Sequence, residues 1–253
     1  VSDLLQRCSL THIPVKGLYL EQLYRPIPRT SGDLDILVSQ QSLSEIIDAL
    51  GEIGYRKKSP GEFIQQLEES HSIELINSNT GIELDLHFRM AEPCYGFMVD
   101  LEGILSDYPA RATEFQLLFS AIHSAKSGFS CLRDLLDIAV LYNEVVSLDK
   151  QREAQSLFRD SNLAKLFTLI QEQHDCLIQT PKKQSKLMTL SLGHKGRLSK
   201  EIAFLSAIGF GQKLKYLFHL FFIPRDTDWD APFPYLLKPF RTLKKFIQTV
   251  KQR

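Results

Sequence analysis

Two acidic, alternating segments constrain the fold of this chain more than any other feature. The first is residues 32–38 (GDLDILV), and the second is residues 81–88 (GIELDLHF). Acidic and aliphatic residues alternate in both segments, which predicts two β-strands. Because residues i and i+2 of a strand share a face, Asp33 and Asp35 are expected to point the same way. The second strand is expected to present three polar side chains on one face: Glu83, Asp85 and His87.

The carboxylates of these two strands favour a metal site. Like charges this close together are costly unless a cation lies between them. If the strands are neighbours, Asp33, Asp35 and Asp85 converge, and such oxygen ligands suit Mg²⁺. This arrangement is typical of phosphoryl or nucleotidyl transfer. Two simpler interpretations stay open here, namely a solvated pair of strand-end acids and the wet face of an antiparallel sheet.

Composition indicates a folded protein and excludes a few classes. The 253 residues, 43% of them hydrophobic, suffice for one large domain or two small ones. No stretch approaches the roughly 20 apolar residues of a membrane span. The four cysteines are scattered without zinc-site spacing, which favours free thiols and a cytoplasmic location.

The zero net charge of the chain conceals an asymmetry. Residues 182–253 hold 15 Lys and Arg but only 4 Asp and Glu, so this segment carries +11 and residues 1–181 carry −11. The basic segment could contact a triphosphate, nucleic acid or lipid headgroups. A solvated helical face, or a surface that packs on the acidic part, explains the charge equally well.

The hydrophobic pattern changes from strand to helix period near Met90. Before it, the sequence predicts a strand, a short helix, the acidic strand, a helix capped by Ser42 and a hairpin of residues 70–77 and 81–88. After it, helices are predicted over residues 114–126, 132–142, 148–160, 163–173 and 202–223, with a basic helix at the end of the chain. The expected fold is therefore α+β, with a small mixed sheet and helices in residues 1–92 and a mainly helical region in residues 93–253.

The motifs of the chain, with these elements placed, resemble those of a known family. The residues that carry the resemblance are Val15-Lys16-Gly17, Arg29-x-Ser31-Gly32-Asp33-x-Asp35, Leu50-x-x-x-Gly54-Tyr55, His71, Glu83–Phe88, His123-x-x-Lys126, Leu132–Ala139, Asp228-Trp229 and Lys238–Arg241. Together they are similar to the uncharacterised nucleotidyltransferase family of bacterial biosynthetic clusters, which has the minimal nucleotidyltransferase fold. The resemblance extends over nearly the whole chain.

The resemblance implies a Mg²⁺-dependent transfer of a nucleotide from an NTP, with ATP as the expected donor. It implies a two-metal site with three catalytic ligands: Asp33, Asp35 and Asp85. The residues expected to bind the nucleotide are Lys16, Gly17, Arg29, Ser31 and Gly32. Many nucleotidyltransferases have Gly-Ser where this chain has Gly17-Leu18, so a phosphate-binding serine hydroxyl is missing there.

Three roles stay open in the sequence. Either Glu83 or Asp85 is the third carboxylate ligand of the metal, because both lie on the same face of the strand. His87 either orients Asp85, contacts substrate or is structural. His123, on an apolar helix, is either a hydrogen-bonded core residue or a catalytic one.

Three functions from different classes compete at this stage. The first is a nucleotidyltransferase that acts on a hydroxyl of an unidentified acceptor, which could be a small molecule, a peptide or a protein. The second is a catalytically silent module of the same fold that binds a nucleotide or a partner. The third is a glycosyltransferase with an Asp-x-Asp metal site, which is disfavoured because only 32 residues precede Asp33.

Overall fold

The computed structural model describes residues 1–24, 31–58, 70–95, 99–127 and 131–179, together with the single residues 63, 67, 68, 97, 129 and 213. The predicted helix over residues 202–223, the basic C-terminal helix and Arg29 lie outside the described residues.

Five strands form one mixed sheet. They are β1 (His12–Val15), β2 (Leu34–Val38), β3 (Tyr55–Lys57), β4 (Ser72–Asn77) and β5 (Glu83–His87). Their order across the sheet is β1-β2-β5-β4-β3. The two central strands β2 and β5 are parallel, and the other neighbours are antiparallel. The two acidic segments are therefore adjacent strands, which is the condition under which their carboxylates were expected to converge.

Helices flank this sheet and then continue beyond it. Those before or within the sheet are α1 (Ser2–Arg7), α2 (Gly17–Leu20) and α3 (Leu43–Glu52), and the 3₁₀ turn η1 (Pro93–Tyr95) follows the last strand. Those that follow are α5 (Leu101–Lys126), α6 (Leu132–Ser147), α7 (Gln151–Asp160) and α8 (Ala164–Gln179). All regular elements described after residue 100 are helices, which confirms the predicted change from a small mixed sheet to a helical region.

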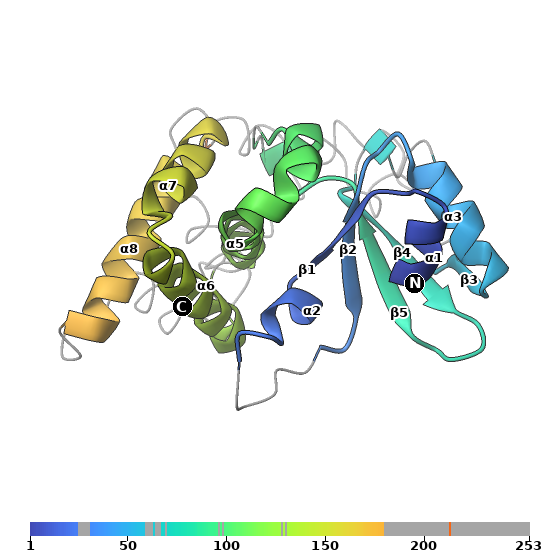
Figure 1. The fold of residues 1–253 in the computed structure, drawn as a ribbon, viewed down its shortest axis with the longest axis horizontal. Helices are drawn as coiled ribbons and strands as arrows, with labels where there is room; N and C mark the ends of the chain where they lie inside the picture. Colours follow the sequence, from blue (N-terminus) through green and yellow to red (C-terminus); the bar gives the residue numbers. More distant parts are fainter. Residues whose placement is uncertain are drawn as a thin grey trace, which may run out of the picture.

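Helices lie on either side of the sheet (Figure 1), and the sheet separates two hydrophobic clusters. One face packs against α1 and α3 through Ile36 and Val38 of β2 and Leu84 and Leu86 of β5. Leu37 points the other way and belongs to a larger cluster built mainly from α5 to α8. Asp35 of β2 and the polar residues of β5 alternate with these aliphatic residues. They therefore lie on the same face of the sheet as Leu37, toward α5 to α8. A functional site on that face lies between the sheet and the helical region.

The larger cluster contains residues from both sides of position 92. Ile13 and Val15 of β1 pack in it together with Phe115 and Phe119 of α5. The division of the chain into residues 1–92 and 93–253 stays a prediction.

Several local predictions were incomplete. The short strand β3 and the helix α1 were not predicted. The apolar run of residues 18–24 predicted a helix up to Tyr24, whereas α2 ends at Leu20. Helix α5 begins at Leu101, well before residue 114, and it continues through Pro109 with non-helical backbone angles at Arg111.

The structure confirms Ser42 as the first residue of the predicted capping box but not the side-chain hydrogen bond of that box. Ser42 is the N-cap residue of α3, but its side chain makes no capping hydrogen bond. Gly54 does follow the end of α3, and its φ of +92° explains why a glycine stands there. None of the helices described is both long and apolar enough to cross a membrane.

Candidate active site

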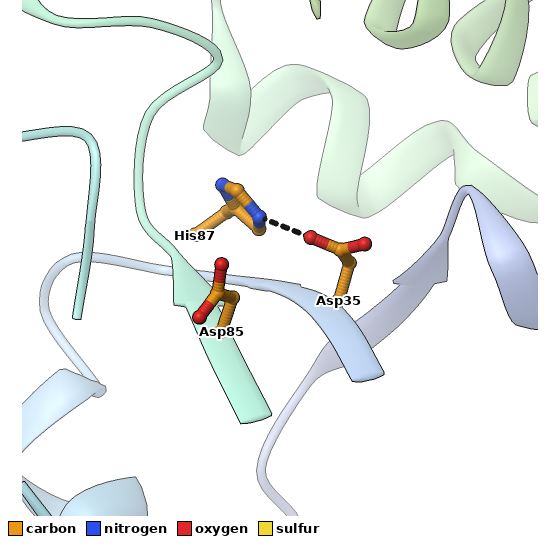
Figure 2. Close-up of side chains that lie close together, drawn as sticks. All are labelled: Asp35, Asp85 and His87. Atoms are coloured by element: carbon orange, nitrogen blue, oxygen red, sulfur yellow. Dashed lines mark hydrogen bonds and ion pairs between the residues drawn. The ribbon is translucent and has the colours of Figure 1, made fainter. Parts of the chain in front are cut away.

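Asp35 and Asp85 lie opposite each other on the two central parallel strands. Asp35 is buried, with 3% of its surface exposed, and Asp85 is partly buried. Figure 2 shows both carboxylates beside the His87 ring. One potential ligand atom from each of these three residues lies within 4.8 Å of the others. Two of the three expected carboxylates, those of Asp35 and Asp85, therefore lie close together in the structure.

His87 holds Asp35 rather than Asp85. Its Nε2 lies 2.8 Å from Asp35 Oδ1 (Figure 2), and its ring makes a T-shaped contact with Phe119 of α5. Burial lowers the pKa of His87, although the bond to Asp35 opposes this, so the ring is neutral near pH 7. A carboxylate can only accept, so the proton of the neutral ring resides on Nε2. That nitrogen already donates to Asp35, so His87 positions the carboxylate, and the lone pair of the neutral ring is on Nδ1, which has no hydrogen-bond partner among the described residues.

Lys16 supplies the second partner of Asp35. Its Nζ lies 3.1 Å from the same Oδ1 atom, and 16% of the lysine side chain is exposed. Burial by itself would raise the pKa of Asp35, but the hydrogen bond from His87 and the charge of Lys16 outweigh it and lower the pKa to about 2. Asp35 is therefore a fixed, permanently ionised carboxylate.

Asp85 has the opposite electrostatic character. Burial raises its pKa to about 6, and the charge of Asp35 is the next contribution. The difference between the two neighbours follows from their partners, since both favourable contacts go to Asp35. When one carboxylate raises the pKa of its neighbour, as Asp35 does for Asp85, a cation bound between the two would be stabilised.

Gln116 of α5 fixes the backbone at Lys16. Its Oε1 accepts from the Lys16 N–H at 3.1 Å, and its Nε2 donates to the Pro14 carbonyl at 2.8 Å and to the Tyr108 hydroxyl at 3.1 Å. Lys16 has a φ of +51°, which is uncommon for a residue other than glycine. Backbone strain of this kind persists only where surrounding contacts impose it. The fully buried Gln116 supplies such contacts, and sequence patterns gave no sign of this role.

The other predicted site residues have varied positions. Asp33 is exposed just before β2 and accepts a hydrogen bond from Ser31 Oγ at 3.2 Å. Gly32 is exposed beside them, and Gly17 is buried at the start of α2. Glu83 shares the strand face of Asp85, but its carboxylate pairs with Lys58 at 2.9 Å.

A pocket opens in front of Asp33 and Asp35, and its other wall comes from the helical region. The residues that line it are Lys16, Ser31, Asp33, Asp35, Ser120, His123, Arg133, Asp134 and Asp137. Burial, with the charges of Lys16 and Lys126, lowers the pKa of His123 to about 3, so this ring is neutral. Asp137 is buried and accepts from the Tyr24 hydroxyl at 2.7 Å. Among the wall residues on α5 and α6, the sequence singled out only His123 as a candidate.

Asp85 does not line this pocket but lies next to it on β5. Beyond His87, a second polar cluster joins β4 to α5. Lys126 Nζ lies 3.1 Å from His71 Nε2 and 2.8 Å from Glu92. The His71 and His87 rings are 5.5 Å apart between centroids, so this cluster supports the ring that holds Asp35.

The paired carboxylates of β2 and β5 fit an enzyme of the nucleotidyltransferase class, and the family to which the chain belongs assigns it to that class. A family model described as an uncharacterised nucleotidyltransferase matches residues 1–172, and the chain belongs to that family. The match spans all five strands and most of the helices described above. A search of curated proteins found no match to this chain. The expected association with biosynthetic clusters stays a prediction.

Proposed function

We propose that the enzyme transfers a nucleoside monophosphate from an NTP, with ATP as the expected donor, to a hydroxyl group of an acceptor. The observation that carries the proposal is the pairing of Asp35 with Asp85 on adjacent parallel strands, with Lys16 and Asp33 at the same end of the sheet. A lysine beside clustered carboxylates suits a ligand that is a polyphosphate accompanied by cations.

The chemistry of the donor set fits Mg²⁺. Asp35, Asp85 and the exposed Asp33 offer carboxylate oxygens, the ligands that this ion prefers, and Nε2 of His87 is engaged with Asp35. The raised pKa of Asp85, caused by burial and then by Asp35, adds electrostatic support for a cation there. We therefore assign these three aspartates as the residues that would hold the metal. An ion held by these aspartates would supply charge neutralisation for the triphosphate and a lower pKa for the attacking hydroxyl.

The residues of the chain have distinct roles in the proposed reaction. Lys16 contributes a positive charge suited to a phosphate oxygen, and Gln116 holds the backbone that presents it. His87 keeps Asp35 oriented. Asp85 accepts the proton of the acceptor hydroxyl. The geometry favours Asp85 over Glu83 for this role, because Glu83 is paired with Lys58.

The bonds exchanged in this reaction follow from the chemistry of nucleotidyl transfer. The acceptor oxygen forms a bond to the α-phosphorus, while the bond from that phosphorus to the oxygen bridging to the β-phosphate breaks. Pyrophosphate leaves with the electron pair of the broken bond, and the hydroxyl proton passes to Asp85. No oxidant or reductant is needed.

Isotopic labelling tests this proposal. The protein is incubated with Mg²⁺, a cell extract as the source of acceptors, and ATP labelled at either the α- or the γ-phosphate. Label from the α position alone should enter a product, together with release of pyrophosphate. The Asp85→Asn variant should bind ATP yet form little product. Transfer from the γ position would identify a kinase, and nucleotide binding without any transfer would favour a silent binding module.

A further inference from the structure

The helical wall of the pocket carries two polar groups that the proposed reaction does not use. Ser120 and His123 both lie on α5, and both line the space in front of Asp33 and Asp35. In an α-helix, residues three apart lie on the same face, so the two side chains are neighbours on one side of α5. They therefore present their hydrogen-bonding groups to the same part of the pocket.

Both groups keep hydrogen-bonding capacity that the described part of the chain does not use. Only 5% of the surface of Ser120 is exposed, and its Oγ has no hydrogen-bond partner among the described residues. Buried polar atoms without a partner are uncommon in folded proteins, and each one calls for an explanation. Burial and nearby charges determine the pKa of His123, with no hydrogen bond from a described residue. One nitrogen of this neutral ring donates and the other accepts, so a ligand with hydroxyl groups satisfies both residues.

The lining of the pocket indicates which part of a nucleotide can occupy it. None of the nine described residues that line it is aliphatic, and none is a phenylalanine, tyrosine or tryptophan. The flat face of a nucleobase is largely apolar, and proteins commonly bind it by stacking on aromatic side chains. An entirely polar lining favours a hydroxylated group over a base.

The sheet side of the pocket belongs to the triphosphate in the proposed reaction. Lys16 suits a phosphate oxygen, and Asp33 and Asp35 are two of the residues that would hold the accompanying metal. Asp85, which takes the proton of the acceptor in that reaction, does not line the pocket but lies next to it on β5. The pocket therefore accommodates the donor nucleotide, and the acceptor approaches from the side of Asp85. The ribose is joined to the α-phosphate through its 5′ carbon, so the helical wall is the surface that it meets.

We propose that Ser120 and His123 form a ribose subsite, in which they hydrogen-bond the 2′ and 3′ hydroxyl groups of the donor nucleotide. This inference rests on the proposed nucleotidyl transfer and names the sugar that the enzyme selects. The donor is then a ribonucleoside triphosphate, and nucleotides whose sugar lacks these hydroxyls bind less tightly. Selection of the sugar comes from α5, whereas the metal ligands come from the sheet side of the pocket.

Two nucleotides that differ only in the sugar test the subsite. ATP carries both hydroxyl groups, and 2′,3′-dideoxy-ATP carries neither. Their affinities for the full chain are measured by calorimetry with Mg²⁺ and without acceptor. Each neutral hydrogen bond contributes modestly to binding, so ATP should bind at least about tenfold more tightly than the dideoxy form. Equal affinities in the wild-type protein would overturn the inference.

Ser120→Ala is the test variant, and Ser124→Ala is its matched control. Both serines are buried on α5 and have an Oγ without a partner in the described part of the chain, but of the two only Ser120 lines the pocket. Ser120→Ala should weaken ATP binding several-fold and leave the affinity for dideoxy-ATP unchanged, whereas Ser124→Ala should change neither. Neither variant should lower the melting temperature. An equal loss for both nucleotides in Ser120→Ala, or a lost preference in Ser124→Ala, would contradict the subsite.

Two substitutions of His123 test the second residue of the subsite. His123→Gln keeps one donor and one acceptor on a neutral side chain, and His123→Leu keeps neither. The preference for ATP over dideoxy-ATP should therefore be larger in His123→Gln than in His123→Leu. An equal preference in these two variants would exclude His123 from the subsite.

The same titrations separate this inference from the function on which it rests. If ATP binds with Mg²⁺ but the wild-type protein prefers neither sugar, the ribose subsite is wrong and the nucleotide site stands. If Ser120→Ala binds both nucleotides like the wild type but forms less labelled product with cell extract, the wall belongs to the acceptor and the inference is also wrong. Failure of ATP to bind with Mg²⁺ would contradict the proposed function itself.

Discussion

Asp35 and Asp85 are direct neighbours on β2 and β5, yet the pKa of the first is about 2 and that of the second is about 6. Burial raises the pKa of both carboxyl groups. Only Asp35 receives the hydrogen bond from His87 and the contact with Lys16. One carboxylate is therefore stabilised by the protein alone, and the other is left with an electrostatic cost at neutral pH.

Replacing Asp85 should stabilise the protein while it removes activity. Its folded-state pKa of about 6 lies above the ordinary value of 3.8, so ionisation opposes folding. This cost is absent below pH 3.8, grows between pH 3.8 and 6 and is fully present above that. The Asp85→Asn variant should therefore melt a few degrees higher than the wild type at pH 7.5, and the two should coincide near pH 3.5. Equal melting temperatures at both pH values would contradict this account, and millimolar Mg²⁺ should narrow the gap at pH 7.5.

Asp35 and Asp33 should differ sharply in their effect on stability. Asp35→Asn removes the anionic partner of Lys16 and His87, and breaking a buried pair of this kind costs about 3 kcal/mol. Asp33 is exposed, so Asp33→Asn should change the free energy of unfolding by less than about 0.5 kcal/mol. Urea denaturation of both variants measures the difference. A large loss of unfolding free energy in Asp33→Asn, or no loss in Asp35→Asn, would contradict the exposed position of Asp33 and the buried ion pair of Asp35.

Gln116 should be needed for nucleotide affinity through the backbone of Lys16. Gln116→Leu leaves the Lys16 N–H and the Pro14 carbonyl without this partner, and we expect a loss of about 2–4 kcal/mol, since each unpaired group costs about 1–3 kcal/mol. Gln116→Glu keeps an acceptor for the Lys16 N–H and should fall between the wild type and Gln116→Leu.

The measurements for Gln116 are urea denaturation and the affinity for an ATP analogue. At a temperature where both variants are folded, affinity should decrease in the order wild type, Glu, Leu. A Gln116→Leu protein that binds nucleotide as tightly as the wild type would exclude the positioning role.

Two glycines at the end of α3 should respond in opposite directions. Gly54 has a φ of +92°, and a Cβ added there would lie 2.9 Å from the Asn79 Nδ2 atom. Gly54→Ala should destabilise the protein by at least about 1–2 kcal/mol. Gly51 lies within the helix with nothing within 4 Å of an added Cβ, so Gly51→Ala should stabilise it by about 0.5–1 kcal/mol. Thermal melts of the pair test the backbone geometry between α3 and β3, and loss of stability in both would contradict it.

Alternation in the sequence indicated which side chains share a face of each acidic strand, but not that the two strands are neighbours. Asp33 and Asp35 share one face, as do Glu83, Asp85 and His87, and the parallel pairing of β2 with β5 places Asp35 beside Asp85. The same alternation could not distinguish Glu83 from Asp85, because that choice depends on Lys58. It also could not indicate that His87 contacts Asp35 instead of the neighbour on its own strand.

Features that depend on distant residues were beyond prediction. Gln116 lies a hundred residues from Lys16, and the unusual backbone of Lys16 depends on that contact. Asp134 and Ser120 enter the pocket only because α5 and α6 pack over the sheet. The early start of α5 was not predicted because proline is normally unfavourable inside a helix, and Pro109 lies within this one. Strand β3 was not predicted because it is only three residues long.

The binding of a non-hydrolysable ATP analogue tests the central claim most directly, and Asp33→Asn is the best variant for it. Asp33 is exposed, so a change in binding cannot be attributed to unfolding. Calorimetry should show tight binding with Mg²⁺, weak binding with EDTA, and at least about a tenfold loss in Asp33→Asn when Mg²⁺ is present. Equal affinity with Mg²⁺ and EDTA, or full affinity in Asp33→Asn, would contradict a metal-dependent nucleotide site at the ends of β2 and β5.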